Sequence, residues 1–294
     1  MSKVWLITGS SRGLGLALAQ AVLAAGHRLV ATARKPEQLR ELVEQYGERV
    51  RAVALDVTDP AAARAAVATA TSAFGRLDVV VNNAGYGNVA SIEDVAEADF
   101  REQFETNFFG VMHVTRAALP VMRAQGDGHI IQISSIGGRT GSPGLSAYQS
   151  AKWAVEGFSE VLAKEVGPLG IRVTIVEPGG FRTDWAGSSM RVDPVSDAYQ
   201  PTVGAFMERV RKNTDGSRGD PAKAARAILR ISEEKQPPLR LLLGTDAVFL
   251  AGAVAAQRAE EDARWKALSA STDYDGMVDF AQTSVARMLA QQRS

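Results

Sequence analysis

The stretch Val4-Trp5-Leu6-Ile7-Thr8-Gly9-Ser10-Ser11-Arg12-Gly13-Leu14-Gly15 decides the fold, because it joins a short apolar run to three closely spaced glycines. The run predicts a buried strand, and the residues that follow, Leu14 to Ala25, predict a helix. Glycines at such a turn let the backbone bend sharply and approach a ligand, while the helix N-terminus attracts a phosphate. The stretch therefore predicts a βα turn that binds a phosphate-bearing ligand, with a tight turn of purely structural purpose as the alternative.

Short runs rich in Val, Ile and Leu alternate with segments of helical periodicity along the chain. This βαβ rhythm predicts a parallel sheet, and nearly continuous apolar strands predict helices on both faces. We therefore expect a single doubly wound α/β domain over residues 1–244, with about seven strands, and a helical extension over residues 245–294 packed on it. The predicted strands are Val4–Thr8, Leu29–Ala33, Val50–Leu55, Leu77–Asn82, His129–Ser134, Arg172–Glu177 and Arg240–Leu243; predicted helices include Leu14–Ala25, Ala61–Phe74 and Asp99–Arg123.

The composition excludes several classes of function. The 294 residues carry 33 Lys and Arg against 33 Asp and Glu, so no basic surplus favours nucleic acid or an anionic membrane. The chain has no cysteine, which excludes disulfides, thiol catalysis and thiolate metal sites, and its three scattered histidines have no metal-ligand spacing. We expect no metal, no nucleic acid and no membrane among the partners.

Two apolar segments bear on localisation. The stretch Leu239–Ala256 is interrupted by Arg240 and Asp246, and so is too short and too polar to span a bilayer. The first predicted strand begins three residues after Met1, which leaves no room for a secretion signal. We expect a cytoplasmic protein.

The pair Tyr148 and Lys152 indicates proton-transfer chemistry, because residues four apart on a helix share one face. Ser135 lies thirteen residues before the tyrosine, at the end of a predicted strand. A carbonyl that accepts hydride develops negative charge on oxygen, and a tyrosine with a serine can supply a proton and a hydrogen bond there. A neighbouring ammonium favours the phenolate, so we expect Lys152 to lower the pKa of Tyr148.

The order of the motifs resembles the short-chain dehydrogenase/reductase family over about residues 3–244. The glycine turn, Asn82-Asn83-Ala84-Gly85, Asn107, Ser135, Tyr148, Lys152 and Pro178-Gly179 follow one another at spacings similar to that family's. The last fifty residues resemble the longer ends of its 17β-hydroxysteroid dehydrogenase-like branch. The resemblance implies a Rossmann fold, an NAD(P)-dependent oxidoreductase acting on CH–OH groups, a small-molecule carbonyl or alcohol substrate, and a homodimer or homotetramer.

The resemblance also implies roles for individual residues. Asn107 would hold a water that relays protons to Lys152, and Asp56 would contact the adenine amino group. Ser134 is interpreted as structural, because alternation along a strand points it away from Ser135. The segment Asn82–Gly85 would have two roles of equal weight: it would stabilise the central sheet and line the site of the adenosine ribose. The catalytic residues implied are Asn107, Ser135, Tyr148 and Lys152; the cofactor-binding residues implied are Gly9, Ser11, Arg12, Gly13, Leu14, Gly15, Arg34, Asp56, Val57, Asn83, Ala84, Gly85, Tyr148, Lys152, Pro178, Gly179 and Thr183.

The second predicted strand indicates which cofactor is used. A carboxylate at its end would bind the ribose hydroxyls of NAD and repel the extra phosphate of NADP, but this place falls on Ala33. Arg34 follows, and Arg12 precedes Gly13, so two guanidinium groups are available for a 2′-phosphate. We therefore expect NADP(H) rather than NAD(H).

Alternatives remain for activity and substrate. A 3-oxoacyl thioester reductase uses the same residues, and a catalytically silent NADP-binding sensor uses the same fold. Trp185, Phe181, Met190 and Leu145 offer an apolar surface that fits a bulky hydrophobic substrate, or that packs a lid against the body. The extension after residue 244 either caps the pocket or forms a subunit contact.

Overall fold

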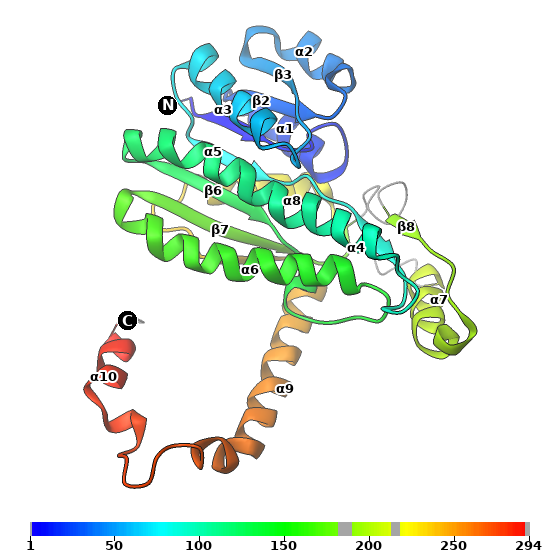
Figure 1. Ribbon diagram of the computed structural model, residues 1–294. Coiled ribbons are helices and arrows are strands. Elements are labelled where there is room, and N and C mark those ends of the chain that lie inside the picture. The colour runs from blue at the N-terminus through cyan, green and yellow to red at the C-terminus, as the bar shows by residue number, and fades with distance from the viewer. Residues whose placement is uncertain (1, 182–189, 213–217, 292–294) are drawn as a thin grey trace. The chain divides into compact units, whose positions relative to one another are not determined.

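The computed structural model describes residues 2–181, 190–212 and 218–291, and it contains the predicted sheet of seven parallel strands (Figure 1). The predicted fold class is confirmed, and every predicted strand lies within two residues of its observed bounds. In spatial order the strands are β3 (Val50–Ala54), β2 (Arg28–Ala33), β1 (Val4–Ile7), β4 (Val79–Asn82), β6 (Gly128–Ile133), β7 (Ile171–Pro178) and β9 (Arg240–Leu243).

Two hydrophobic cores lie on the two faces of the sheet, as expected for strands buried on both sides. Trp5 and Ile7 of β1 enter one core, while their neighbours Val4 and Leu6 enter the other, because successive side chains of a strand point to opposite faces. The first core is covered by α1 (Gly13–Ala24) and α8 (Pro221–Ile231); the second is covered by α3 (Pro60–Phe74), α5 (Gly110–Gln125) and α6 (Ser146–Val166) (Figure 1).

The helix predicted over Asp99–Arg123 is divided in the structure. Its first part is α4 (Glu97–Phe104), followed by a π-helical turn over Glu105–Phe109 that leads directly into α5. Such wide turns occur frequently at functional sites. This one contains Asn107.

A second, two-stranded parallel sheet was not predicted. It pairs β5 (Gly87–Val89) with β8 (Met190–Val192), and three-residue strands are too short to give a periodic signal. The remaining helices are α2 (Arg40–Tyr46), α7 (Ala205–Lys212), α9 (Thr245–Ala270) and α10 (Ser284–Gln291).

The chain divides into two compact units, residues 1–251 and 252–294, and the boundary falls within α9. The first unit thus includes the start of α9, where Ala247 and Ala251 are buried. The second contains the rest of α9 and α10. That the C-terminal extension packs on the main domain stays a prediction.

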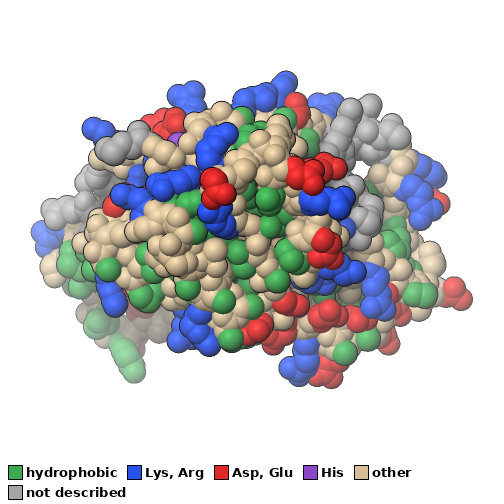
Figure 2. Space-filling model, turned by 90° about the horizontal axis from the view of Figure 1, so that it is seen from above, with side chains coloured by type: hydrophobic (Ala, Val, Ile, Leu, Met, Phe, Trp, Pro, Cys, Tyr) green, Lys and Arg blue, Asp and Glu red, His purple; other side chains and the backbone are tan. Residues whose placement is uncertain are grey.

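The surface charge is mixed, as the balanced composition predicts. Figure 2 shows basic and acidic side chains interspersed over one face of the molecule. Among the described residues, no helix has both the length and the apolar character needed to cross a membrane.

Candidate active site

The glycine-rich turn between β1 and α1 has the shape that its sequence predicts. Gly9 and Gly13 have φ angles of 67° and 55°, a region that side chains other than glycine disfavour. A Cβ atom at Gly15 would lie 2.1 Å from the carbonyl oxygen of Gly9 and 2.5 Å from Nδ2 of Asn83. Gly9, Gly15 and Asn83 pack closely together, and the N-terminus of α1 faces a cavity. A phosphate is favoured at such a helix end.

Thr8 and Asn83 connect this turn to the end of β4. Nδ2 of Asn83 donates to the carbonyl oxygens of Thr8 (2.9 Å) and Gly9 (3.1 Å). In the other direction, Oγ1 of Thr8 accepts the backbone N–H groups of Asn83 and Ala84, each at 2.9 Å. Thr8 was not among the predicted site residues. It holds two backbone segments that border the cavity.

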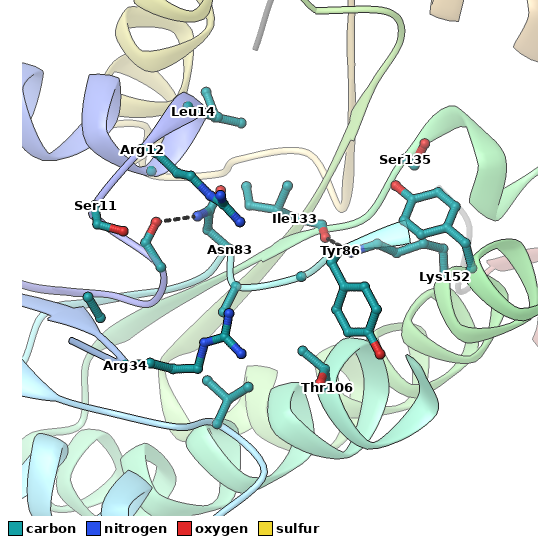
Figure 3. A pocket seen from close by; sticks show the side chains of 18 of the residues that line it. Ser11, Arg12, Leu14, Arg34, Asn83, Tyr86, Thr106, Ile133, Ser135 and Lys152 are labelled. Atoms are coloured by element: carbon teal, nitrogen blue, oxygen red, sulfur yellow. Dashed lines mark hydrogen bonds between the residues drawn. The ribbon is translucent and has the colours of Figure 1, made fainter. Parts of the chain in front are cut away.

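The cavity has a volume of about 1640 Å³ and extends from this turn to Tyr148. Figure 3 shows it from Ser11 and Arg12 at one end to Ser135 and Lys152 at the other. We call its two ends the glycine-turn end and the Tyr148 end. Of the predicted site residues, Asn107 does not line it and Thr183 lies outside the described residues, as does Trp185. Those that line it are Gly9, Ser11, Arg12, Gly13, Leu14, Gly15, Arg34, Asp56, Val57, Asn83, Ala84, Gly85, Ser135, Tyr148, Lys152, Pro178 and Gly179.

Two arginines and an aspartate lie at the glycine-turn end. The side chains of Arg12 and Arg34 point into the cavity from different elements (Figure 3). Strand β2 ends at Ala33, so no carboxylate occupies the strand end before Arg34. Asp56 is exposed, and its Oδ1 accepts from the backbone N–H of Thr58 (3.0 Å) and from Oγ1 of Thr58 (2.8 Å).

Tyr148 and Lys152 lie side by side on α6, and both are buried, with 7% and 5% of their surfaces exposed. Nζ of Lys152 donates to the carbonyl oxygen of Ile133 at 2.7 Å and lies 5.8 Å from the centre of the Tyr148 ring. Ser135 follows β6 and forms a side-chain hydrogen bond with Tyr148. The end of β6 therefore contributes both a carbonyl that holds the lysine and a hydroxyl that meets the tyrosine.

Burial disfavours the charged form of both side chains, and this shifts the pKa of each. It raises the pKa of Tyr148 to about 12, against the opposing effect of the Ser135 hydrogen bond. It lowers the pKa of Lys152 to about 8, against the attraction of Glu156. The expectation that Lys152 lowers the pKa of Tyr148 is therefore not met in the protein alone, because loss of hydration is the larger effect.

Asn107 is fully buried beside the cavity, in the π-helical turn. Its Oδ1 accepts the backbone N–H of Tyr86 at 3.1 Å, and its Nδ2 donates to the carbonyl oxygen of Tyr86 at 2.8 Å. A Cβ atom at Gly85 would lie 2.9 Å from this Oδ1 and 3.8 Å from Nζ of Lys152. Gly85 thus allows Asn107 and Lys152 to approach the same small space.

A cluster of two buried glutamates and two partly exposed arginines behind Ser134 was not predicted. Glu177 is fully buried, and its Oε1 accepts from Nε of Arg139 at 2.7 Å; Oε2 of Glu156 accepts from Nε of Arg240 at 3.0 Å. Burial, with a smaller effect of Glu177, raises the pKa of Glu156 to about 7. Ser134 belongs to this side: a Cβ atom at Gly138 would approach both its Oγ (2.7 Å) and Oε1 of Glu156 (3.1 Å). The sequence signal was a glutamate inside the apolar run of β7.

The apolar residues proposed for a substrate pocket separate into two groups. Phe181 lines the cavity, with Tyr86 and Val210. Leu145 and Met190 instead pack with Val89 and Val203 in a small separate core. For those two residues the packing alternative describes the structure. In the described ranges, no group of three or more His, Asp or Glu side chains is placed to hold a metal ion.

Comparison with known proteins gives consistent results. A family model described as short chain dehydrogenase matches residues 3–192. The chain is 57% identical over 270 residues to oxidoreductase BOA17 of Botryotinia fuckeliana, covering 92% of this chain and 98% of the relative.

Two solved structures are similar over most of their length. The crystal structure of a short-chain dehydrogenase from Streptomyces avermitilis is 42% identical, with a TM-score of 0.87, and the match covers 93% of this chain and 99% of that one. The structure of ElxO with NADP bound is 28% identical, with a TM-score of 0.70, covering 83% and 97% respectively.

Proposed function

The chain belongs to the short-chain dehydrogenase family of oxidoreductases, and on that premise we propose that it interconverts a carbonyl group and a secondary alcohol with NADP(H) as cofactor. The observation that carries the proposal is the cavity that joins the glycine turn to the buried pair Tyr148 and Lys152. A dinucleotide is long enough to need both ends, and the similar ElxO structure contains NADP.

The residues at the glycine-turn end fit a dinucleotide phosphate. The close approach of Gly9, Gly15 and Asn83 leaves no space for side chains at the turn, so the backbone itself borders the cavity. We propose that Arg34, helped by Arg12, binds the 2′-phosphate of NADP, since both guanidinium groups point into this end (Figure 3). NAD(H) is the less favoured cofactor, because Ala33 offers no carboxylate for its ribose.

The residues at the Tyr148 end would handle the proton. When bound, the nicotinamide supplies a hydride to the carbonyl carbon or accepts one from the alcohol. Because burial keeps the phenol of Tyr148 protonated at neutral pH, it can donate its proton to the carbonyl oxygen in the direction of reduction. Ser135 would donate a hydrogen bond to the same oxygen. Both groups then act on the charge that develops in the transition state.

Lys152 and Asn107 would support this transfer. With a pKa of about 8, Lys152 is mainly protonated at pH 7, so its ammonium group favours the phenolate that Tyr148 becomes. The carbonyl of Ile133 fixes its position. We propose that Asn107 holds a water that returns a proton to Lys152, because its Oδ1 keeps a second lone pair beside Gly85.

The substrate that we propose is a small-molecule ketone or secondary alcohol that is bulky and hydrophobic. Phe181, Tyr86 and Val210 line the cavity and offer an apolar surface to it. We also propose that the protein forms a homodimer or homotetramer through α5 and α6. Measurement of the molar mass in solution tests this.

The test is oxidation of NADPH and of NADH across free ketones, aldehydes, steroids and thioester-linked 3-oxoacyl chains. Turnover of a free ketone that is faster with NADPH than with NADH supports the proposal. Turnover of only the thioester-linked substrates replaces it with a 3-oxoacyl thioester reductase. Binding of NADPH without turnover of any substrate supports the silent sensor.

A further inference from the structure

The turn that follows β7 lines the cavity with four consecutive residues, Pro178 to Phe181. A side chain from far along the chain holds this turn: Oδ2 of Asp246, in the first turn of α9, accepts the backbone N–H of Gly180 at 2.7 Å. Strand β9 adds a second bond, from the N–H of Gly179 to the carbonyl of Leu243 at 2.9 Å. The position of the turn therefore depends on residues that follow β7 by more than sixty positions.

The carboxylate of Asp246 is enclosed between two glycines. A Cβ atom at Gly179 would lie 2.3 Å from its Oδ2 and 2.4 Å from its Oδ1, and a Cβ atom at Gly244 would lie 2.4 Å from Oδ1. A side chain at either place would force the carboxylate of Asp246 or the backbone to move. Asp246 thus fixes the backbone of the turn by direct contact as well as by a hydrogen bond.

One oxygen of this carboxylate has no evident structural purpose. Oδ1 is buried and has no hydrogen-bond partner in the part of the chain that the structure describes. A buried acceptor without a partner costs stability, so an apolar side chain would anchor the start of α9 at lower cost. The aspartate is better explained by what it does to the Gly179–Gly180 turn.

We propose that Asp246 is a positioning residue of the cofactor site, which sets the turn Pro178–Phe181 against the nicotinamide end of the bound cofactor. The inference rests on the proposed function, because it assigns this turn to the cofactor. It extends the site to α9, beyond residue 192 where the family match ends. The residue acts through the backbone of Gly180 and does not touch the reacting atoms.

The first test is the affinity of Asp246→Ala for NADPH, measured by the change in NADPH fluorescence on binding. Loss of a charge-assisted hydrogen bond predicts a dissociation constant raised about ten-fold or more. The matched control is Asp279→Ala, which also removes a carboxylate that accepts a backbone N–H (Ala281, 2.9 Å) but lines no part of the cavity. The control should bind NADPH like the wild type; unchanged binding by Asp246→Ala would overturn the inference.

The second test uses Gly179→Ala and the double variant Gly179→Ala/Asp246→Ala. The backbone of Gly179 has no positive φ, and the three atoms nearest to an added Cβ atom all belong to the carboxylate group of Asp246. Gly179→Ala alone should therefore weaken NADPH binding, and removal of the carboxylate should recover part of the loss. A double variant as weak as the product of the two single effects would contradict the inference, because independent sites behave additively.

Two further measurements, NADPH binding by Asp246→Asn and amide hydrogen exchange, test the inference independently of the alanine variant's affinity. Asp246→Asn retains an acceptor for the Gly180 N–H, so its dissociation constant for NADPH should lie within a few-fold of the wild-type value. This variant tests the inference even if Asp246→Ala does not fold. Amide hydrogen exchange of residues 179–181 without cofactor should be faster in Asp246→Ala and unchanged in Asp279→Ala. If the wild type binds neither NADPH nor NADH, the proposed function fails; unchanged exchange in Asp246→Ala shows separately that Asp246 does not hold the turn.

Discussion

At the glycine-turn end of the cavity, polar groups are satisfied by one another, whereas at the Tyr148 end the ionisable groups are held in an environment that opposes their charge. Asn83 and Thr8 exchange four hydrogen bonds with the backbone that borders the first end. At the second end, burial raises the pKa of Tyr148 and lowers that of Lys152.

The difference separates two tasks. A backbone already bonded in place can bind a charged ligand without reorganising, which favours affinity. Burial keeps the phenol of Tyr148 neutral and makes the charge on Lys152 less stable, so both groups respond strongly to a charge that develops beside them, which favours chemistry. Substitutions at the first end should therefore change binding, and substitutions at the second should change the rate.

The largest effect is expected at the Tyr148 end. Tyr148→Phe removes the phenolic proton and keeps the ring, so kcat should fall by about 10²- to 10⁴-fold. The dissociation constant of NADPH should change by less than about three-fold, because the hydroxyl meets Ser135 and not the glycine turn. Steady-state kinetics and NADPH titration measure both; an equal loss of affinity would break the comparison.

The reverse pattern is expected for Gly15→Ala. The added Cβ atom would meet the carbonyl of Gly9 and the amide of Asn83, so the turn must shift. NADPH affinity should fall about ten-fold or more, while kcat at saturating cofactor changes little. Gly157→Ala is the matched control, because no atom lies within 4 Å of a Cβ atom at that helical glycine. Loss of kcat alone in Gly15→Ala would contradict the division of tasks.

A smaller and more selective effect is expected for Arg34→Ala. Loss of one guanidinium contact of about 1.5–3 kcal/mol should reduce the preference for NADPH over NADH by roughly ten-fold or more. NADH kinetics should stay unchanged, since NADH has no 2′-phosphate. Arg40→Ala, which removes an exposed arginine paired with Glu44, is the control. Equal losses with both cofactors would remove Arg34 from the NADP assignment.

The smallest effect is expected in the pH dependence of the protein's stability, and it comes from Glu156, which lies behind the Tyr148 end. Burial raises the pKa of Glu156 to about 7, so the folded protein keeps a proton that the unfolded chain releases above its ordinary pKa of 4.5. The stabilisation is complete below pH 4.5 and is lost as the pH rises through 7. Relative to Glu156→Gln, the wild type should lose unfolding free energy steadily between pH 5 and 8.

Urea unfolding of both proteins at several pH values measures this difference. Arg34→Ala, at the opposite end of the cavity, should follow the wild-type profile. A constant offset between the wild type and Glu156→Gln across this range would show that Glu156 does not titrate as inferred.

The sequence predicted features that depend on near neighbours in the chain. The glycine turn and the bounds of β9 follow from local periodicity and from residues with restricted conformations. The motifs that end β1, β4, β6 and β7 border one cavity because parallel strands bring their carboxyl ends to one edge of the sheet. Topology turned separate short motifs into a shared site.

The features that the sequence did not predict depend on distant contacts. Asp246 looks like an ordinary residue at a helix start until Gly180 is seen beside it. Glu156 and Arg240 become a partly buried ion pair only when α6 and β9 come together. The pKa of Tyr148 was predicted in the wrong direction for the protein alone, because the spacing to Lys152 is visible in the sequence and the degree of burial is not.

The π-helical turn at Glu105–Phe109 makes the length of this helix as important as its composition. Deleting one residue there would let the segment close as a regular α-helix, with its ladder of hydrogen bonds intact. A π-helical turn takes about one residue more than an α-helical turn to complete a full rotation, so α4 and α5 would keep nearly the same orientation and the change would fall on the residues of the turn itself. Asn107 would no longer meet the backbone of Tyr86. The number of residues between α4 and α5 is thus itself a functional constraint, and an insertion or deletion would harm the site more than most substitutions.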